Sequence, residues 1–392
     1  MEPFDPNKYV KIVEKNRERI DKARRFEEPD RVPVVIGLGG PYYAKIFGYT
    51  LAEYYNNLSI MLDVQIKGMK WRLTWLQDDY TGMGIWLDIG SISEGIVFNC
   101  EIEMPSQKNP WKSPWIVPCI KSLEDIDKLE VPDPYRHEGI KAYYEKLEKY
   151  EKLAKSYYGN ISVGGKLQIH PPMSAAGSLL GPRRLYSWLY KYPNDMHKLF
   201  RKLEETFKVL QEYYYDVRGG SKGYLGLCDD HAGYLNRQMY EKFVLPYNLR
   251  LYETYGTEHR SLHMDSHMDH ITDILLEKYK LNSVDAGVEN DIRILAKAFK
   301  GKIVFSGNAD WRVLLSGSLE KIELEVEKCI YIAAPGGGYI FDNGGETYTG
   351  VPPEMLKYEV EYAKKVGRYP ITEKNFKHLD QIKNLIGNFN IR

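Results

Sequence analysis

The sequence predicts an α/β fold, a (β/α)8 (TIM) barrel with an N-terminal helical extension, formed by residues 1–392 as a single domain. Short β-rich runs alternate with long amphipathic stretches, a pattern typical of parallel strands joined by helical crossovers. About eight such strand–helix units follow one another, as a closed barrel requires. No Pro/Gly/Ser-rich linker or block of charge divides the chain, which favours one barrel over two domains.

The elements follow in chain order from their residue patterns. Strands are expected where apolar residues gather in short runs that end at a polar turn. Leu199, Leu203, Phe207 and Leu210 recur at three- and four-residue spacing, which predicts a helix with one face on the core. The irregular segment near residues 89–131 contains Pro and Trp and is expected to be a hairpin or lid insertion. The predicted strands are 31–37, 161–167, 223–228, 261–264, 281–284, 302–306 and 338–341, and the predicted helices are 51–75, 139–157, 184–215, 237–255, 269–279, 292–299, 318–333 and 353–365.

Composition excludes several classes of partner. Lys plus Arg and Asp plus Glu both number 54, so the formal charge is zero and no basic field favours nucleic acid or an anionic membrane. The charged N-terminal stretch lacks the apolar segment of a signal peptide, and no apolar run approaches the roughly 18 residues of a transmembrane helix. We therefore expect a cytoplasmic protein.

The four cysteines, Cys100, Cys119, Cys228 and Cys329, are scattered along the chain without a CxxC pair. This spacing argues against a disulfide framework or a zinc ribbon. Buried free thiols are the expectation for each of them.

Several motifs in a fixed order resemble the uroporphyrinogen decarboxylase superfamily, which includes the zinc methyltransferases that exchange methyl groups with corrinoid proteins. ERIDKARRFEEPDRVPV resembles the opening helix and first strand of that superfamily, and LEDIDKLEVPDP resembles the linker before the second barrel strand. CDDHAGYLNRQMYEKFVLPY, LHMDS, SGNADWRVLLSG and APGGGYIFDNGGETYTG follow in the family's order. The resemblance covers nearly the whole chain and implies a barrel with its active site at the C-terminal ends of the strands.

The decarboxylase itself is matched less well than the fold. The decarboxylase has an Arg-Gln-Ala-Gly-Arg segment after the first strand, which gives guanidinium partners to a substrate with many carboxylates. The corresponding segment here, GLGGPYY from Gly37 to Tyr43, has no cation. Asp88 in IWLDIGS aligns with the aspartate that binds the pyrroles, although a lone aspartate can equally be a helix N-cap. Tetrapyrrole decarboxylation is therefore the second hypothesis.

The densest ionisable cluster, LHMDSHMDH, stands at the end of a predicted strand. Superfamily members that act on thiols carry His-x-Cys-Gly here, with a third cysteine ligand after the last strand. Asp265 replaces that first cysteine and PGGGYIF contains none, so the resemblance implies an oxygen-rich site suited to an ether donor. Members that demethylate methoxylated aromatics have an acid where Asp285 stands. We expect zinc on His263, Asp265 and Asp285; in the alternative, His263 only orients a loop.

Catalytic candidates occur at another predicted strand end. His231, in CDDHAG, is the candidate general acid because imidazole titrates near neutral pH, and its alternative is a structural cap of the next helix. Asp230 and Asp88 join it as catalytic candidates. Asp229 and Asp230 must point in different directions if the strand continues, so that one faces the pocket.

Substrate contacts are expected from a histidine and four aromatic residues. His170, in QIHPP, would be held on the rim by the two prolines that follow it. Tyr42, Tyr43, Trp86 and Tyr339 could form an aromatic wall for a ring substrate, with core packing as the alternative for each.

These features predict a methyltransferase that moves a methyl group from a small methylated donor to the Co(I) corrinoid, a cobalamin-type cofactor, of a separate protein. A methoxylated aromatic compound is the expected donor. No cobalamin-binding motif occurs in the chain, so the corrinoid must arrive on a partner. The family resemblance also suggests a homodimer. A third hypothesis, a non-catalytic binding module on the same barrel, is disfavoured by the crowded histidines.

Overall fold

The computed structural model describes residues 5–159 and 161–387, which divide into two compact units. Unit 1 consists of Tyr49–Asp63 and Gly84–Arg260. Unit 2 consists of the described residues up to Gly48, Val64–Met83, and those from Ser261 onward. Helix α4 (Leu58–Trp71) and strand β6 (His259–Met264) each run from one unit into the other.

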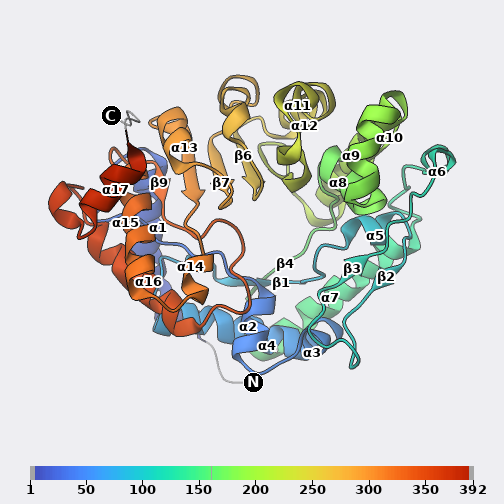
Figure 1. The fold of residues 1–392 in the computed structure, drawn as a ribbon. Helices are drawn as coiled ribbons and strands as arrows, with labels where there is room; N and C mark the ends of the chain where they lie inside the picture. The colour runs from blue at the N-terminus through green and yellow to red at the C-terminus, as the bar shows by residue number, and fades with distance from the viewer. Residues whose placement is uncertain (1–4, 160, 388–392) are drawn as a thin grey trace. The chain divides into compact units, whose positions relative to one another are not determined.

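Unit 1 is mostly helical, with short strands between the helices (Figure 1). Strands β1 and β4 pair in parallel, with Ile85 opposite Val163. The elements of unit 1 are α3 (Leu51–Asn56), β1 (Gly84–Trp86), α5 (Ser93–Val97), β2 (Ile102–Glu103), β3 (Trp115–Ile116), α6 (Leu123–Lys128), α7 (Glu138–Tyr158), β4 (Ser162–Gly164), α8 (Pro172–Leu180), α9 (Pro182–Lys191), α10 (Pro193–Arg218), β5 (Tyr224–Cys228), η3 (Asp230–Tyr234), α11 (Arg237–Phe243) and α12 (Leu245–Tyr255).

Unit 2 holds parallel strands in the order β6, β7, β8, β9, with helices between successive strands. Helices α15 and α16 lie side by side (Figure 1). The elements of unit 2 are η1 (Pro6–Tyr9), α1 (Val10–Arg24), α2 (Gly40–Ile46), η2 (Arg72–Leu76), η4 (Asp269–Ile271), η5 (Ile274–Lys278), β7 (Ser283–Ala286), α13 (Ile292–Phe299), β8 (Val304–Gly307), α14 (Arg312–Leu315), α15 (Leu319–Ala333), β9 (Tyr339–Ile340), α16 (Pro353–Val366), η6 (Glu373–Asn375) and α17 (Leu379–Ile386).

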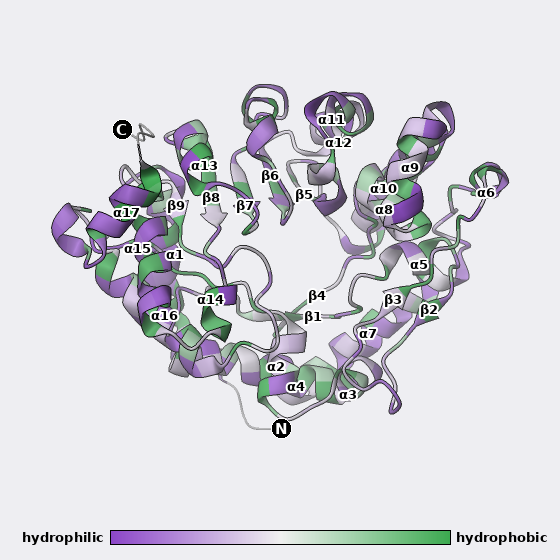
Figure 2. Cartoon of the chain, in the orientation of Figure 1, coloured by the Kyte–Doolittle hydropathy of each residue, from purple (hydrophilic) through white to green (hydrophobic). Residues whose placement is uncertain are grey.

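The predicted alternation of strands and helices is confirmed, and helix α13 has the predicted bounds. Leu199, Leu203, Phe207 and Leu210 all lie buried on one face of α10, as their spacing predicted. Figure 2 shows hydrophobic and hydrophilic residues alternating along such helices. The N-terminal helix is present as α1.

Long predicted helices are broken where a cap or a proline interrupts them. Asn57 takes an extended conformation, and its side chain caps the backbone N–H groups of Ser59 and Ile60, so the predicted helix 51–75 divides into α3 and α4. Pro193 cannot donate a backbone hydrogen bond and starts α10 anew after α9. The predicted helix 269–279 consists instead of one 3-10 turn and one π turn.

The first predicted strand, 31–37, is extended but forms only isolated bridges, at Arg31 and at Val34. Buried carboxylates take the place of a neighbouring strand on part of this segment. Asp79 accepts the backbone N–H of Val34 at 2.8 Å, and Asp78 accepts that of Ile36 at 3.1 Å. The ladder is therefore replaced locally by side-chain acceptors.

The insertion is confirmed as a hairpin in which β2 and β3 pair antiparallel. The expectation of free thiols was wrong for Cys100 and Cys119, which form a disulfide with a Cα–Cα distance of 5.6 Å. The cysteines lie 19 residues apart in sequence, and the hairpin fold brings them together. Cys329 is the buried free thiol that was expected, whereas the expectation of burial was wrong for Cys228, which is exposed at the end of β5.

Candidate functional site

Three parallel strands of unit 2 align a row of polar side chains. His263 on β6 is in register with Asp285 on β7, and Asp285 is in register with Ser306 on β8. Residues in register on parallel strands project to the same face of the sheet. Leu262 and Val284, their neighbours in sequence, are buried on the opposite face. The alternation of the strands therefore separates the polar row from the core.

His263 bridges two carboxylates. Its Nδ1 lies 2.8 Å from Asp285 Oδ2, and its Nε2 lies 3.5 Å from Asp265 Oδ1. Ser306 donates to the other oxygen of Asp285 at 3.2 Å. Burial alone would lower the pKa of His263, but the hydrogen bonds and charges of both carboxylates raise it to about 11. Without a metal, the ring is therefore an imidazolium at neutral pH.

The predicted zinc ligands can be tested against this geometry. Zinc lies about 2.0–2.2 Å from nitrogen and oxygen ligands, so two ligands of a tetrahedral site are about 3.4 Å apart. The 3.5 Å between His263 Nε2 and Asp265 Oδ1 fits that spacing. Asp285 lies on the opposite ring nitrogen, where a carboxylate orients a metal-binding histidine. Two of the three side chains thus fit as ligands, and the third fits as the group that holds His263.

Sequence reasoning missed the glycines and the carboxyl group packed around this cluster. Gly345 has φ +98°, and a Cβ on it would stand 2.6 Å from Asp265 Oδ1. Asp342, which follows β9, accepts the backbone N–H of Gly37 at 2.7 Å. Burial, together with the charge of Asp285, raises the pKa of Asp342 well above its usual range. The segment APGGGYIFDNGGETYTG, which the sequence analysis gave only as a family motif, contains both residues.

Unit 1 carries a separate carboxylate–histidine pair. Glu94 Oε1 accepts both the backbone N–H of His170 at 2.7 Å and a hydrogen bond from its Nδ1 at 2.8 Å. Glu94 is completely buried, whereas the His170 side chain is 31% exposed. Burial would lower the pKa of His170, but the charge and hydrogen bond of Glu94, together with the charges of Asp230 and Asp229, raise it overall. Glu94 is a functional candidate that the sequence analysis missed.

The acidic pair Asp229–Asp230 follows the end of β5 and consists of a buried and a partly exposed residue. Asp229 is completely buried and accepts hydrogen bonds from Ser174 Oγ and Asn248 Nδ2, both at 2.7 Å. Burial raises the pKa of Asp229 to about 6 despite these bonds. Asp230 begins the 3-10 helix η3 and is partly exposed.

His231 has the contacts of a structural residue. Its ring Nδ1 lies 3.1 Å from Tyr186 Oη, which also donates to the His231 carbonyl oxygen. The opposite edge packs on helix α8, so closely that a Cβ at Gly177 would be 2.5 Å from Nε2. Burial lowers the pKa of His231, which disfavours the role of proton donor at neutral pH. The raised pKa of His170 makes it the better candidate acid.

The aromatic candidates are mostly core residues in the structure. Tyr42 and Tyr339 are completely buried, and their hydroxyls donate to the carbonyl oxygens of Val351 and Gly307. Tyr43 is also buried. Core packing, the alternative that the sequence analysis left open, therefore accounts for these three rings. Trp86, on β1, is 36% exposed and is the one of the four that offers a surface.

Asp88 follows β1 and caps a turn instead of a helix. Its Oδ1 accepts the backbone N–H of Gly90 at 2.8 Å, and its Oδ2 accepts the Tyr54 hydroxyl at 2.9 Å. Burial raises the pKa of Asp88. The side chain lines a cavity of unit 1.

Comparison with known proteins agrees with the fold. The family model described as uroporphyrinogen decarboxylase (URO-D) matches residues 15–366. A uroporphyrinogen decarboxylase of Anaeromyxobacter sp. is 27% identical over 258 residues, 63% of this chain and 70% of the relative. That of Bacillus subtilis is 24% identical over 367 residues, 89% of this chain and 96% of the relative. A methyltransferase from Methanosarcina mazei has a similar structure, with a TM-score of 0.62, 16% sequence identity, and coverage of 89% of this chain and 98% of that one.

The predicted α/β fold of the TIM-barrel type is confirmed by the family match and by the structural likeness. In the part of the chain that the structure describes, no helix is long and apolar enough to cross a membrane.

Proposed function

Because the chain belongs to the uroporphyrinogen decarboxylase family, we propose that it is the methyl-transferring kind of member. Its donor is a small methylated compound, most simply a methoxylated aromatic, and its acceptor is the Co(I) corrinoid of a separate partner protein. The observation that carries this proposal is the carboxylate-rich surrounding of the segment Gly37–Tyr43 in unit 2. The name of the structurally similar methyltransferase from Methanosarcina mazei supports it.

A tetrapyrrole substrate with many carboxylates requires cations around it. The segment Gly37–Tyr43 contains none. The buried Arg72 acts on Tyr43 but is already paired with Asp78, and two acidic side chains lie beside the segment. Asp342 binds the backbone N–H of Gly37, and the Glu346 carboxylate occupies the space that a Cβ at Gly39 would need. The Glu346 carboxylate would repel the acidic side chains of a porphyrinogen, whereas an uncharged ether meets no such repulsion.

A zinc ion held at His263, in the polar row of unit 2, is the proposed electrophile for the donor oxygen. We assign His263 Nε2 and Asp265 as zinc ligands and Asp285 as the group that orients His263. Zinc bound there would act as a Lewis acid on the ether oxygen of the donor. The methyl carbon passes to Co(I), and the oxygen that it leaves takes up a proton and departs as the alcohol or phenol. This proton comes from the solvent.

The test is incubation of the purified protein with zinc, a reduced corrinoid protein, and a panel of methoxybenzenes, methylamines and methyl thiols. Formation of methyl-Co(III), followed by its absorbance, is expected with methoxybenzenes and is expected to fall in His263→Gln. His267→Gln is the matched control, because His267 is exposed two residues beyond Asp265. Failure with every donor would overturn the proposal.

The alternative function is decarboxylation of uroporphyrinogen, which the names of the curated relatives favour. Its assay is conversion of uroporphyrinogen to coproporphyrinogen without added cofactor. Turnover there, combined with no methyl transfer, would establish the alternative. A cytoplasmic location and a homodimer belong to the proposal as well, and size-exclusion chromatography with light scattering tests the dimer.

A further inference from the structure

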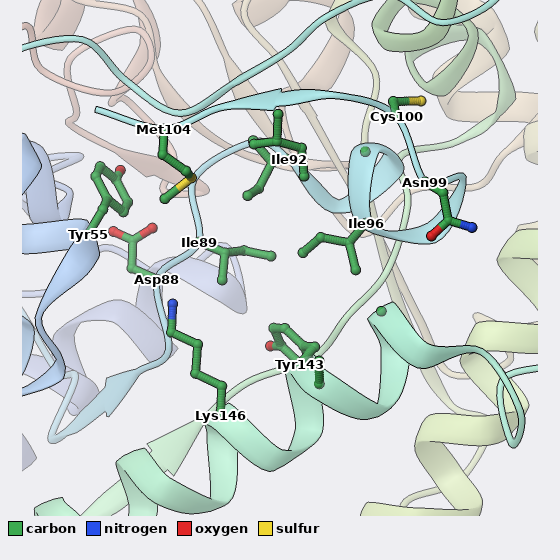
Figure 3. A pocket seen from close by; sticks show the side chains of 14 residues that line it. Tyr55, Asp88, Ile89, Ile92, Ile96, Asn99, Cys100, Met104, Tyr143 and Lys146 are labelled. Atoms are coloured by element: carbon green, nitrogen blue, oxygen red, sulfur yellow. The ribbon is translucent and has the colours of Figure 1, made fainter. Parts of the chain in front are cut away.

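Unit 1 contains a cavity of about 520 Å³ that the proposed methyl transfer does not use (Figure 3). This volume falls within the usual range for small-molecule sites. Helix α5 and the β2 hairpin segment supply isoleucine and methionine side chains to its wall, and helix α7 supplies Tyr143 and Lys146. The residues of the His170–Glu94 pair and of the Asp229–His231 segment do not line it.

The cavity wall is apolar over most of its extent and polar at one end. Ile89, Ile92, Ile96 and Met104 surround its interior (Figure 3). Asp88 and Lys146 lie at the polar end, where the Lys146 side chain points toward Asp88 (Figure 3). A ligand would therefore place an apolar body among the isoleucines and one polar group beside Lys146.

The two charged residues are not equally available to a ligand. Both oxygens of Asp88 already accept hydrogen bonds, from Gly90 and from Tyr54. Lys146 donates no hydrogen bond and forms no ion pair within the part of the chain that the structure describes, although the charge of Asp88 acts on it. Burial lowers the pKa of Lys146. A half-buried ammonium with three donors and no acceptor is stabilised by an anion.

We propose that this cavity binds a small monocarboxylic acid with an apolar, aromatic body, whose carboxylate is held by Lys146 and whose ring lies among Ile92, Ile96 and Tyr143. A single carboxylate matches the single available cation. An aromatic body matches a wall that combines branched aliphatic side chains with a tyrosine ring.

Calorimetric titration of the full-length protein with phenylacetate and 3-phenylpropionate tests the proposal. The matched probes are the corresponding amides, which keep the ring and lose the charge, and hexanoate, which keeps the charge and loses the ring. Both aromatic acids are expected to bind about 10- to 100-fold more tightly than their amides, as is usual for a charge-assisted contact. Tighter binding of hexanoate would overturn the aromatic class, and equal binding of acids and amides would overturn the role of Lys146.

Variants locate the site. Lys146→Met keeps the apolar stem and is expected to lose the same 10- to 100-fold in affinity for the acids. Lys149→Met, an exposed position on the same helix, is the control and is expected to bind as the parent protein does. Ile96→Trp fills the cavity and is expected to abolish binding while circular dichroism shows an unchanged fold.

No binding by the parent protein at millimolar ligand, or undiminished binding by Lys146→Met, would refute the proposal. Zinc binding at His263 is measured separately, so failure here leaves the proposed function in place.

Discussion

Replacing Asp285 by Asn tests whether this carboxylate orients His263 or binds zinc itself. Asp285 accepts a hydrogen bond from His263 Nδ1 at 2.8 Å and is held in turn by Ser306 at 3.2 Å. Loss of such an orienting carboxylate typically weakens metal binding 10- to 100-fold, which is about 1.4–2.8 kcal/mol. A hydrogen bond to a charged group contributes about 1.5–3 kcal/mol, so the two estimates agree.

The assay is zinc affinity measured by competition with a chromogenic chelator. We expect Asp285→Asn to lose about 10- to 100-fold in affinity and Ser306→Ala to lose less, because Ser306 acts only on Asp285. His263→Gln and Asp265→Asn should lose more, because each removes a ligand. His267→Gln is the control and should bind as the parent protein does. The reasoning is refuted if Asp285→Asn binds zinc unchanged, or if it loses as much as His263→Gln.

Three further predictions concern stability. The pKa of Asp229 is about 6 in the folded state against an ordinary 3.8, so the folded state binds more protons between these two pH values. The contribution of Asp229 to the free energy of unfolding therefore falls as the pH rises through that window. Asp229→Asn should remove up to about 3 kcal/mol of this pH dependence, measured by urea unfolding, and an unchanged dependence of stability on pH would contradict the prediction. Gly345→Ala should lower the free energy of unfolding by about 1–3 kcal/mol and weaken zinc binding, because the new Cβ would clash with Asp265. Gly301→Ala, also at positive φ but in open space, should lower stability alone. Equal zinc affinity in both variants would exclude a steric effect of position 345 on Asp265. Replacing both Cys100 and Cys119 by Ser should lower stability by about 3 kcal/mol, as expected for a loop of this length, and unchanged unfolding in urea would mean that the disulfide does not form.

Local pattern was sufficient for most of the secondary structure. Asp291 is the N-cap of helix α13, and the helix has an apolar face. Both signals lie within a few residues of one another in the sequence. The extended segment at Val34 was a different case. Its apolar alternation predicted a strand, but the backbone donors meet the carboxylates of Asp78 and Asp79, more than 40 residues away in sequence. No local pattern contains that information.

The disulfide and the surroundings of His231 show the same limit. Cys100 and Cys119 have no diagnostic spacing, and only the hairpin brings their Cα atoms to 5.6 Å. His231 stands at a strand end, as a catalytic histidine would. Its contact with Gly177 on α8 and its lowered pKa depend on packing between elements.

The sequence by itself determined the family fold, the strand ends at which polar residues gather, and the absence of cations in the segment from Gly37 to Tyr43. These properties follow from residue type and order. Only the tertiary structure decided that Asp285 lies on the far nitrogen of His263, that Glu94 pairs with His170, and that Lys146 lines a cavity without a hydrogen bond to any described residue. The physical reason is that the protonation state and role of a side chain depend on burial and on neighbours within a few ångströms, which the fold supplies from distant parts of the chain.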